Sequence, residues 1–208
     1  MNWLAEIPWD NVLEVLGFSV GLLYLWWEYH ADSRLWFASI VMPAISMWIY
    51  LHKGLYADFA INIYYFLIAV YGYLAWTRGK RRCEKPKGDK RAEVKAALPI
   101  RHIRFAQLFA CSAVFFILWA AIYYMLRYHT NSNVPLADAF TTALSIVAMW
   151  MLARKYIEQW IAWIAVDAVC VFLYIYKGIF FYASLYAIYT IIAFVGYAKW
   201  RRLMRAQI

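Results

Sequence analysis

Seven stretches of this 208-residue chain are apolar over the length that a helix needs to cross a lipid bilayer. The stretches are residues 11–29, 35–52, 55–76, 105–126, 136–153, 157–176 and 179–200. Hydrophobic residues make up 66% of the chain, which excludes an ordinary soluble domain of this size. The sequence therefore predicts an all-α integral membrane protein with seven transmembrane helices.

The basic residues gather on one side of these predicted helices. Of the 21 Lys and Arg residues, 18 lie at or beyond the ends of the first, third, fifth and seventh stretches, and only Lys53, Arg127 and Lys177 follow the others. Because cytoplasmic loops carry the excess of positive charge, we expect an outside N-terminus and a cytoplasmic C-terminus. The long basic loop lacks interleaved aromatic residues and lies beside lipid headgroups, so we expect no nucleic-acid partner.

The chain repeats itself at a shift of 124 residues, without a gap. The aligned pairs include Trp26 with Trp150, Trp36 with Trp160, Tyr65 with Tyr189, Gly72 with Gly196 and Trp76 with Trp200. We interpret the first three and the last three helices as copies of one unit, which the fourth helix joins in parallel orientation, a 3+1+3 plan. The predicted domains are residues 1–77 for the first repeat, 78–104 for a basic cytoplasmic loop, 105–130 for the linking helix, and 131–208 for the second repeat and the C-terminus.

Parallel repeats are a known plan of transporters, with the substrate site between the halves. The alternative is a duplication that only builds a stable bundle. The two copies differ chemically at one central position, because Asp167 has Pro43 as its repeat partner. A proline in a span can kink it, which suits a gating helix, although a kink without a mechanical role is an equal alternative.

An acid and two indoles share one face of the sixth predicted helix. Trp160, Trp163 and Asp167 follow a spacing of 0, 3 and 7 residues. An ionisable group at bilayer depth normally faces a bundle interior or a watery cavity. We interpret the three as a site for a positively charged aromatic molecule, held by stacking, cation–π attraction and charge pairing. The alternatives are a buried anchor for Asp167, pairing with a lysine or a tyrosine, and an interfacial anchor for Trp160.

Further polar candidates lie in the first three helices. Asn62 is expected at a depth similar to that of Asp167, with Tyr56 and Tyr65 as neighbours in the same cavity. Asn62 also suits a hydrogen bond between helices, and the tyrosines suit an interfacial belt. Glu28 is either a ligand or gate contact, or a surface acid paired with Arg34.

Several functions find no support in the residues. The chain has no phosphate-binding glycine loop, no cluster of metal ligands and no nucleophile with a base, so we expect no cofactor, no metal and no catalysis. One deep acid without an intramembrane partner gives little basis for ion coupling, and facilitated diffusion is the expectation. A seven-helix enzyme or receptor and an ion-coupled transporter remain the alternatives.

Four motifs together resemble one family. They are Arg154-Lys-Tyr-x-Glu158-x-Trp160-x-x-Trp163-x-x-x-Asp167, then Tyr174-x-Tyr-Lys-Gly178, Gly54-Leu-Tyr-Ala-Asp58 and Val70-Tyr71-Gly72-Tyr-x-x-Trp76. The chain is similar in these to the PnuC family of bacterial vitamin transporters. The resemblance implies a 3+1+3 fold with the layout of the SWEET sugar facilitators, a homotrimer in the bacterial inner membrane, and import by diffusion with trapping by a cytoplasmic kinase.

The resemblance also bears on the substrate. Nicotinamide riboside importers of the family tend to have Asn at the position of Asp167, Gln at that of Asn62 and no acid at that of Glu28. This sequence departs at all three positions and adds negative charge at two. The expected substrate is therefore thiamine, as in the PnuT branch, and the alternative is nicotinamide riboside, which is also a cation.

Overall fold

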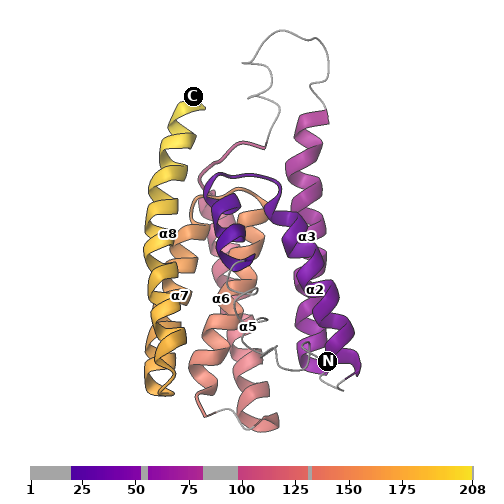
Figure 1. Cartoon of the computed structure of the whole chain (residues 1–208), viewed down its shortest axis with the longest axis vertical. Helices are drawn as coiled ribbons and strands as arrows, with labels where there is room; N and C mark the ends of the chain where they lie inside the picture. The colour runs from indigo at the N-terminus through magenta and orange to yellow at the C-terminus, as the bar shows by residue number, and fades with distance from the viewer. Residues whose placement is uncertain (1–19, 53–55, 82–97, 131–132, 208) are drawn as a thin grey trace, which may run out of the picture. The chain divides into compact units, whose positions relative to one another are not determined.

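The computed structural model describes residues 20–52, 56–81, 98–130 and 133–207 (Figure 1). Residues 20–29 are helical, and the labelled helices are α2 (Leu35–His52), α3 (Tyr56–Arg81), α5 (Phe105–His129), α6 (Pro135–Ala153), α7 (Gln159–Tyr176) and α8 (Phe180–Ala206). No strand occurs within these ranges. Six of the helices are long and apolar enough to cross a membrane, again counting the described residues only. The all-helical membrane fold is confirmed, and residues 11–19 of the first predicted span lie outside the described residues.

The helix bounds follow the predicted spans closely, with two extensions. The bundle helices α3 and α8 continue past the expected ends, to Arg81 and Ala206. Both extensions are rich in basic residues, which a helix carries easily once it has left the apolar part of the membrane. By their contacts, residues 1–66 and 67–208 form two compact units, and each is described by itself.

In the first unit, a tight turn joins the helix of residues 20–29 to α2. Ala31 lies in the left-handed region, with φ of 52°. Its N–H donates to the Glu28 carbonyl at 2.9 Å, and the Asp32 N–H donates to the Trp27 carbonyl at 2.9 Å. These two bonds form a Schellman cap, which satisfies carbonyls at the end of the helix.

In the second unit, the turn between α6 and α7 has the same design. Lys155 is left-handed with φ of 54°, its N–H donates to the Leu152 carbonyl at 2.9 Å, and the Tyr156 N–H donates to the Met151 carbonyl at 3.0 Å. Every one of these residues stands 124 positions after its counterpart in the first turn. The two turns therefore share their backbone conformation and their capping bonds at the shift at which the sequence repeats.

Within the second unit, α7 packs against both α6 and α8, and α5 packs against α6 (Figure 1). A short turn at Gly178, with φ of 72°, reverses the chain between α7 and α8. At this end of the unit, Lys177 Nζ lies 3.5 Å from Asp138 Oδ1, which links the end of α7 to the start of α6. Helices α6, α7 and α8 are therefore antiparallel neighbours joined by short connections.

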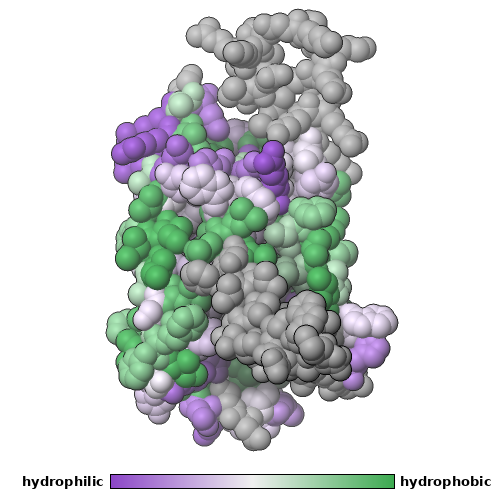
Figure 2. All heavy atoms as spheres, in the orientation of Figure 1, coloured by the Kyte–Doolittle hydropathy of each residue, from purple (hydrophilic) through white to green (hydrophobic). Residues whose placement is uncertain are grey.

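At the opposite end, residues 98–104 are fastened to the turn between α6 and α7. The Arg101 N–H donates to the Lys155 carbonyl at 3.1 Å, and the Ile157 N–H donates to the Arg101 carbonyl at 3.1 Å. The Glu158 carboxylate accepts a bond from the Ile103 N–H at 3.0 Å and lies 2.7 Å from His102 Nδ1. This end carries most of the described basic residues of the unit. Figure 2 shows hydrophilic side chains near the C-terminal end of α8 and hydrophobic side chains over the middle of that helix.

Candidate substrate-binding site

The α7 helix carries the predicted acid and both indoles. Its 18 residues contain no Gly or Pro, so the helix runs without interruption through Trp160, Trp163 and Asp167. Trp160 is 1% exposed and Asp167 is 7% exposed, and Trp163 is half-buried. All three predicted side chains therefore lie on one helix inside the second unit.

Trp160 lies against the backbone of α8. A Cβ atom on Gly196 would be only 2.5 to 2.7 Å from three ring atoms of Trp160, so the glycine is what allows the ring to approach. The Trp200 ring meets the same indole edge to face, with 5.7 Å between centroids. The alternative of an interfacial anchor in lipid is wrong for Trp160, because protein atoms cover the whole side chain.

Two further tryptophans complete an aromatic cluster with Trp160. The Trp76 and Trp200 rings lie 6.4 Å apart, and both are almost fully buried. Trp76 Nε1 donates to the Ala153 carbonyl at 3.1 Å, and Lys155 Nζ lies 4.2 Å from the centre of the Trp76 ring. The prediction missed this cluster, because the repeat shows that Trp76 and Trp200 hold equivalent positions and does not show that they are in contact.

Asp167 has no hydrogen bond or ion pair with any residue that the structure describes. Its predicted alternative as an anchor needs a lysine or a tyrosine hydroxyl as partner. Lys177, at the end of the same helix, pairs with Asp138 instead. A buried acid in a membrane helix without a protein partner is the arrangement expected of a ligand or ion site.

Glu28 belongs to the first unit and is buried, with 2% of its surface exposed. The alternative of a surface acid paired with Arg34 is wrong, since Arg34 Nε lies 3.8 Å from Asp32 Oδ2 on the outside of the turn. Position 28 closely precedes the charged and polar residues His30, Asp32 and Arg34 in the sequence, which is why a surface position was an alternative for it. The repeat partner of Glu28 is Leu152, which is fully buried as well.

The other predicted residues of the first unit lie on α3. Asn62 and Tyr65 are half-buried, and the Tyr65 ring meets Tyr64 edge to face at 5.6 Å. Tyr56 is the first residue of the helix, and its side chain lies outside the described part of the structure. The predicted ligand contacts therefore fall into two groups, one on α7 and one in the first unit.

Gln159 is a polar residue that the prediction missed. It is the first residue of α7, it is 0% exposed, and neither its Nε2 nor its Oε1 has a hydrogen-bond partner among the described residues. Its spacing of four to Trp163 and eight to Asp167 places it on the same face of the helix. That spacing was visible in the sequence, where Gln159 lies within the predicted span 157–176.

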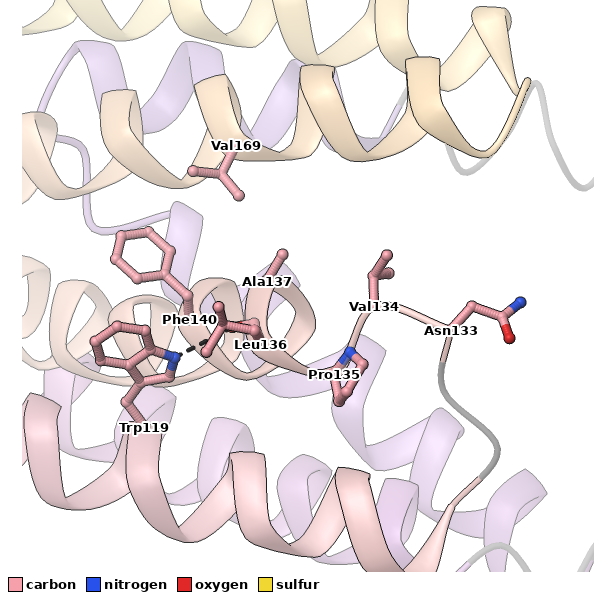
Figure 3. A pocket seen from close by; sticks show the side chains of 8 residues that line it. All are labelled: Trp119, Asn133, Val134, Pro135, Leu136, Ala137, Phe140 and Val169. Atoms are coloured by element: carbon pink, nitrogen blue, oxygen red, sulfur yellow. Dashed lines mark hydrogen bonds between the residues drawn. The ribbon is translucent and has the colours of Figure 1, made fainter.

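A separate apolar cavity of about 500 Å³ lies beside α5, α6 and α7 (Figure 3). Its lining residues are Trp119, Asn133, Val134, Pro135, Leu136, Ala137, Phe140 and Val169. Val169 follows Asp167 by two positions, which turns it about 200° around the helix axis, so the cavity is on the other side of α7. Trp119 Nε1 donates to the Leu136 carbonyl at 3.1 Å, and the lining offers few other polar groups. The cavity is therefore distinct from the polar stripe of α7, which is the face that carries Gln159, Trp160, Trp163 and Asp167.

No group of three His, Cys, Asp or Glu side chains that could hold a metal ion occurs within the described ranges. Cys111 and Cys170 are free and buried. The polar stripe of α7 thus offers an amide, indole N–H groups and a carboxyl, and its chemistry is that of hydrogen bonding and charge pairing.

Helices long and apolar enough to cross a membrane, together with a buried acid that pairs with no described residue, are the features of a multi-pass membrane protein with an internal polar site. A model of the family described as nicotinamide mononucleotide transporter matches residues 11–202. The chain belongs to this family of membrane transporters. The resemblance to the PnuC family seen in the sequence is thereby confirmed.

Individual relatives agree with that assignment. The nicotinamide riboside transporter PnuC of Escherichia coli (strain K12) is 23% identical over 208 residues, covering 94% of this chain and 86% of that protein. The riboflavin/roseoflavin transporter RibM of Streptomyces davaonensis is 31% identical over 134 residues, covering 64% of this chain and 58% of that protein. The crystal structure of the vitamin B3 transporter PnuC shares the fold, with a TM-score of 0.67, 19% identity, and coverage of 97% of this chain and 85% of that chain.

Proposed function

We propose that this protein carries a cationic heteroaromatic vitamin across the membrane by facilitated diffusion, with nicotinamide riboside as its substrate. The observation that carries the proposal is Asp167, a buried acid on the same helix face as Trp163 that forms no hydrogen bond or ion pair with any described residue. A pyridinium ring can stack on an indole while its positive charge faces a carboxylate. The absence of a second buried charge near Asp167 among the described residues of α7 favours diffusion over ion coupling.

The choice of nicotinamide riboside corrects the preference that the sequence suggested. The names of the relatives refer to nicotinamide riboside and riboflavin, which favours the alternative over thiamine. Thiamine stays a second candidate because Asp167 is a carboxyl where an amide is expected for nicotinamide riboside importers. An aminopyrimidine can pair with a carboxylic acid through one donor and one acceptor.

The architecture that we propose is two copies of a three-helix unit joined by α5. The matched caps at Ala31 and Lys155 support the duplication, since they share φ and hydrogen bonds at the shift of 124 residues. The clustering of basic residues at one end of the second unit supports a cytoplasmic C-terminus in a bacterial inner membrane. A homotrimer and trapping of the substrate by a cytoplasmic kinase are further parts of the proposal.

The roles of the remaining predicted residues follow from the same proposal. Trp160 and Trp163 stack on the substrate or gate its path, and Asp167 orients it. Asn62 and Glu28, from the first unit, are proposed as further ligand contacts, with Tyr56 and Tyr65 beside them. The complete burial of Glu28 supports this role over a solvated position.

Binding to the purified protein tests the proposal. Nicotinamide riboside is expected to bind more tightly than thiamine, and Asp167→Ala is expected to weaken its binding about tenfold, since the buried ligand then loses the polar side chain that orients it. Asp138→Ala is the matched control, because it removes an acid that pairs with Lys177 at the end of the helix and leaves Gln159, Trp163 and Asp167 unchanged. Tighter binding of thiamine would refute the substrate, and unchanged binding in Asp167→Ala would make that acid structural.

A further inference from the structure

The buried polar atoms without a partner gather at the start of α7. In the second unit, the buried side-chain nitrogens and oxygens that lack a hydrogen-bond partner belong to Arg154, Gln159, Trp160 and Trp163, counting described residues only. Other buried polar groups nearby are satisfied, such as Trp76 Nε1 and the Tyr156 hydroxyl, which donates to Gln107 Oε1 at 2.9 Å. Unsatisfied groups are rare in native proteins, so this concentration needs an explanation.

Among the residues that carry these atoms, Gln159 has the largest unsatisfied polar group. Its amide offers two N–H donors and a carbonyl acceptor, none of which has a partner, in a side chain with no exposed surface. Its repeat partner is Leu35, which is also 0% exposed. The fold therefore accepts an apolar side chain at the equivalent position, and packing alone does not require an amide there.

The amide also lies in line with the proposed site. Gln159, Trp163 and Asp167 occupy successive turns of one helix face and span about 12 Å along the axis. That length suits a ligand made of a heteroaromatic ring and a sugar-sized substituent. A ligand whose ring lies at Trp163 can place its charge toward Asp167 and a hydrogen-bonding group toward Gln159.

We infer that the Gln159 amide is a specificity-determining contact, which pairs with a ligand group that presents one donor and one acceptor side by side. This inference rests on the proposed function and names the group that the site recognises. The carboxamide of nicotinamide riboside has this pattern, and two amides pair through two hydrogen bonds. The carboxylate of nicotinic acid riboside presents acceptors only, so the amide of Gln159 discriminates against it.

The test compares Gln159→Leu with Gln107→Leu. Both variants replace a glutamine with leucine, but the Gln107 amide already has a protein partner in Tyr156. Affinities for nicotinamide riboside and nicotinic acid riboside are measured on the purified proteins, together with the melting temperature without ligand. In Gln159→Leu the affinity for nicotinamide riboside is expected to fall about tenfold and its preference over nicotinic acid riboside to shrink by a similar factor.

The melting temperature separates a ligand contact from a structural role. Gln159→Leu is expected to melt at the same or a higher temperature, because it removes a buried amide without a partner, whereas Gln107→Leu is expected to melt lower with its preference unchanged. A lower melting temperature of Gln159→Leu with an unchanged preference would overturn the inference. Wild-type protein that fails to bind nicotinamide riboside would refute the proposed function itself, which is a different result.

Discussion

The close approach of Trp160 to Gly196 makes Gly196→Ala a sharp test of the packing of α7 on α8. The added Cβ would lie 2.5 Å from Trp160 Cη2, 2.6 Å from Cζ3 and 2.7 Å from Cζ2. Carbon atoms in proteins settle at about 3.5–4.0 Å, so the ring must move by about 1 Å. Trp160 is fully buried against Trp200, which leaves the ring little space to move.

The sign of the effect distinguishes this contact from ordinary helix propensity. Overpacking of a core costs roughly 1–3 kcal/mol. Alanine favours a helix over glycine by about 1 kcal/mol, so a glycine without a close neighbour would gain stability on the same change. We expect Gly196→Ala to lower the melting temperature of the detergent-solubilised protein by several degrees, as read by size-exclusion chromatography after heating.

The background variant Trp160→Leu provides the control. Because leucine lacks the three ring atoms that the new Cβ would meet, Gly196→Ala is expected to be neutral or slightly stabilising in that background. An unchanged or higher melting temperature of Gly196→Ala in the otherwise wild-type chain would show that the indole does not lie against α8 as described.

Two further changes test the turns at the ends of the helices. Ala31→Gly is expected to raise the melting temperature by a degree or more, since the left-handed φ of 52° costs a non-glycine residue about 1 kcal/mol; a decrease would contradict the assigned φ. Glu158→Gln is expected to lower the melting temperature by a few degrees, because the carboxylate accepts a hydrogen bond from the Ile103 N–H and lies 2.7 Å from His102 Nδ1. Equal thermal stability and equal protease resistance near residue 103 would refute the attachment of residues 98–104 to this turn.

The course of the chain was largely predictable from the sequence. Apolar length predicts helices because lipid offers no other partner for backbone groups, and the bounds of α2, α6 and α7 agree with the predicted spans to within two residues. The repeat was visible in its tryptophans and glycines, since a large ring such as Trp160 needs a small residue such as Gly196 opposite it. The helical period placed Trp160, Trp163 and Asp167 on one face of α7, whereas their role in binding stays a prediction.

What the sequence left open concerns the surroundings of single residues. Glu28 and Gln159 lie near charged turns in the chain, and only tertiary packing shows that both are buried. The fastening of residues 98–104 joins partners that are more than 50 positions apart, and periodicity carries no information about such pairs. The choice of substrate depends on how a few polar groups fit the ligand. The carboxyl at position 167, where nicotinamide riboside importers tend to have an amide, does not identify the substrate by itself.

Uptake of labelled nicotinamide riboside into proteoliposomes tests the central claim most directly. The purified protein is reconstituted with proton and sodium gradients collapsed, and uptake is followed against protein-free liposomes. A facilitated-diffusion carrier is expected to give saturable uptake that ends when the inside concentration equals the outside concentration, with slower uptake by Asp167→Ala. Uptake no faster than in protein-free liposomes, or accumulation that requires an ion gradient, would contradict the account.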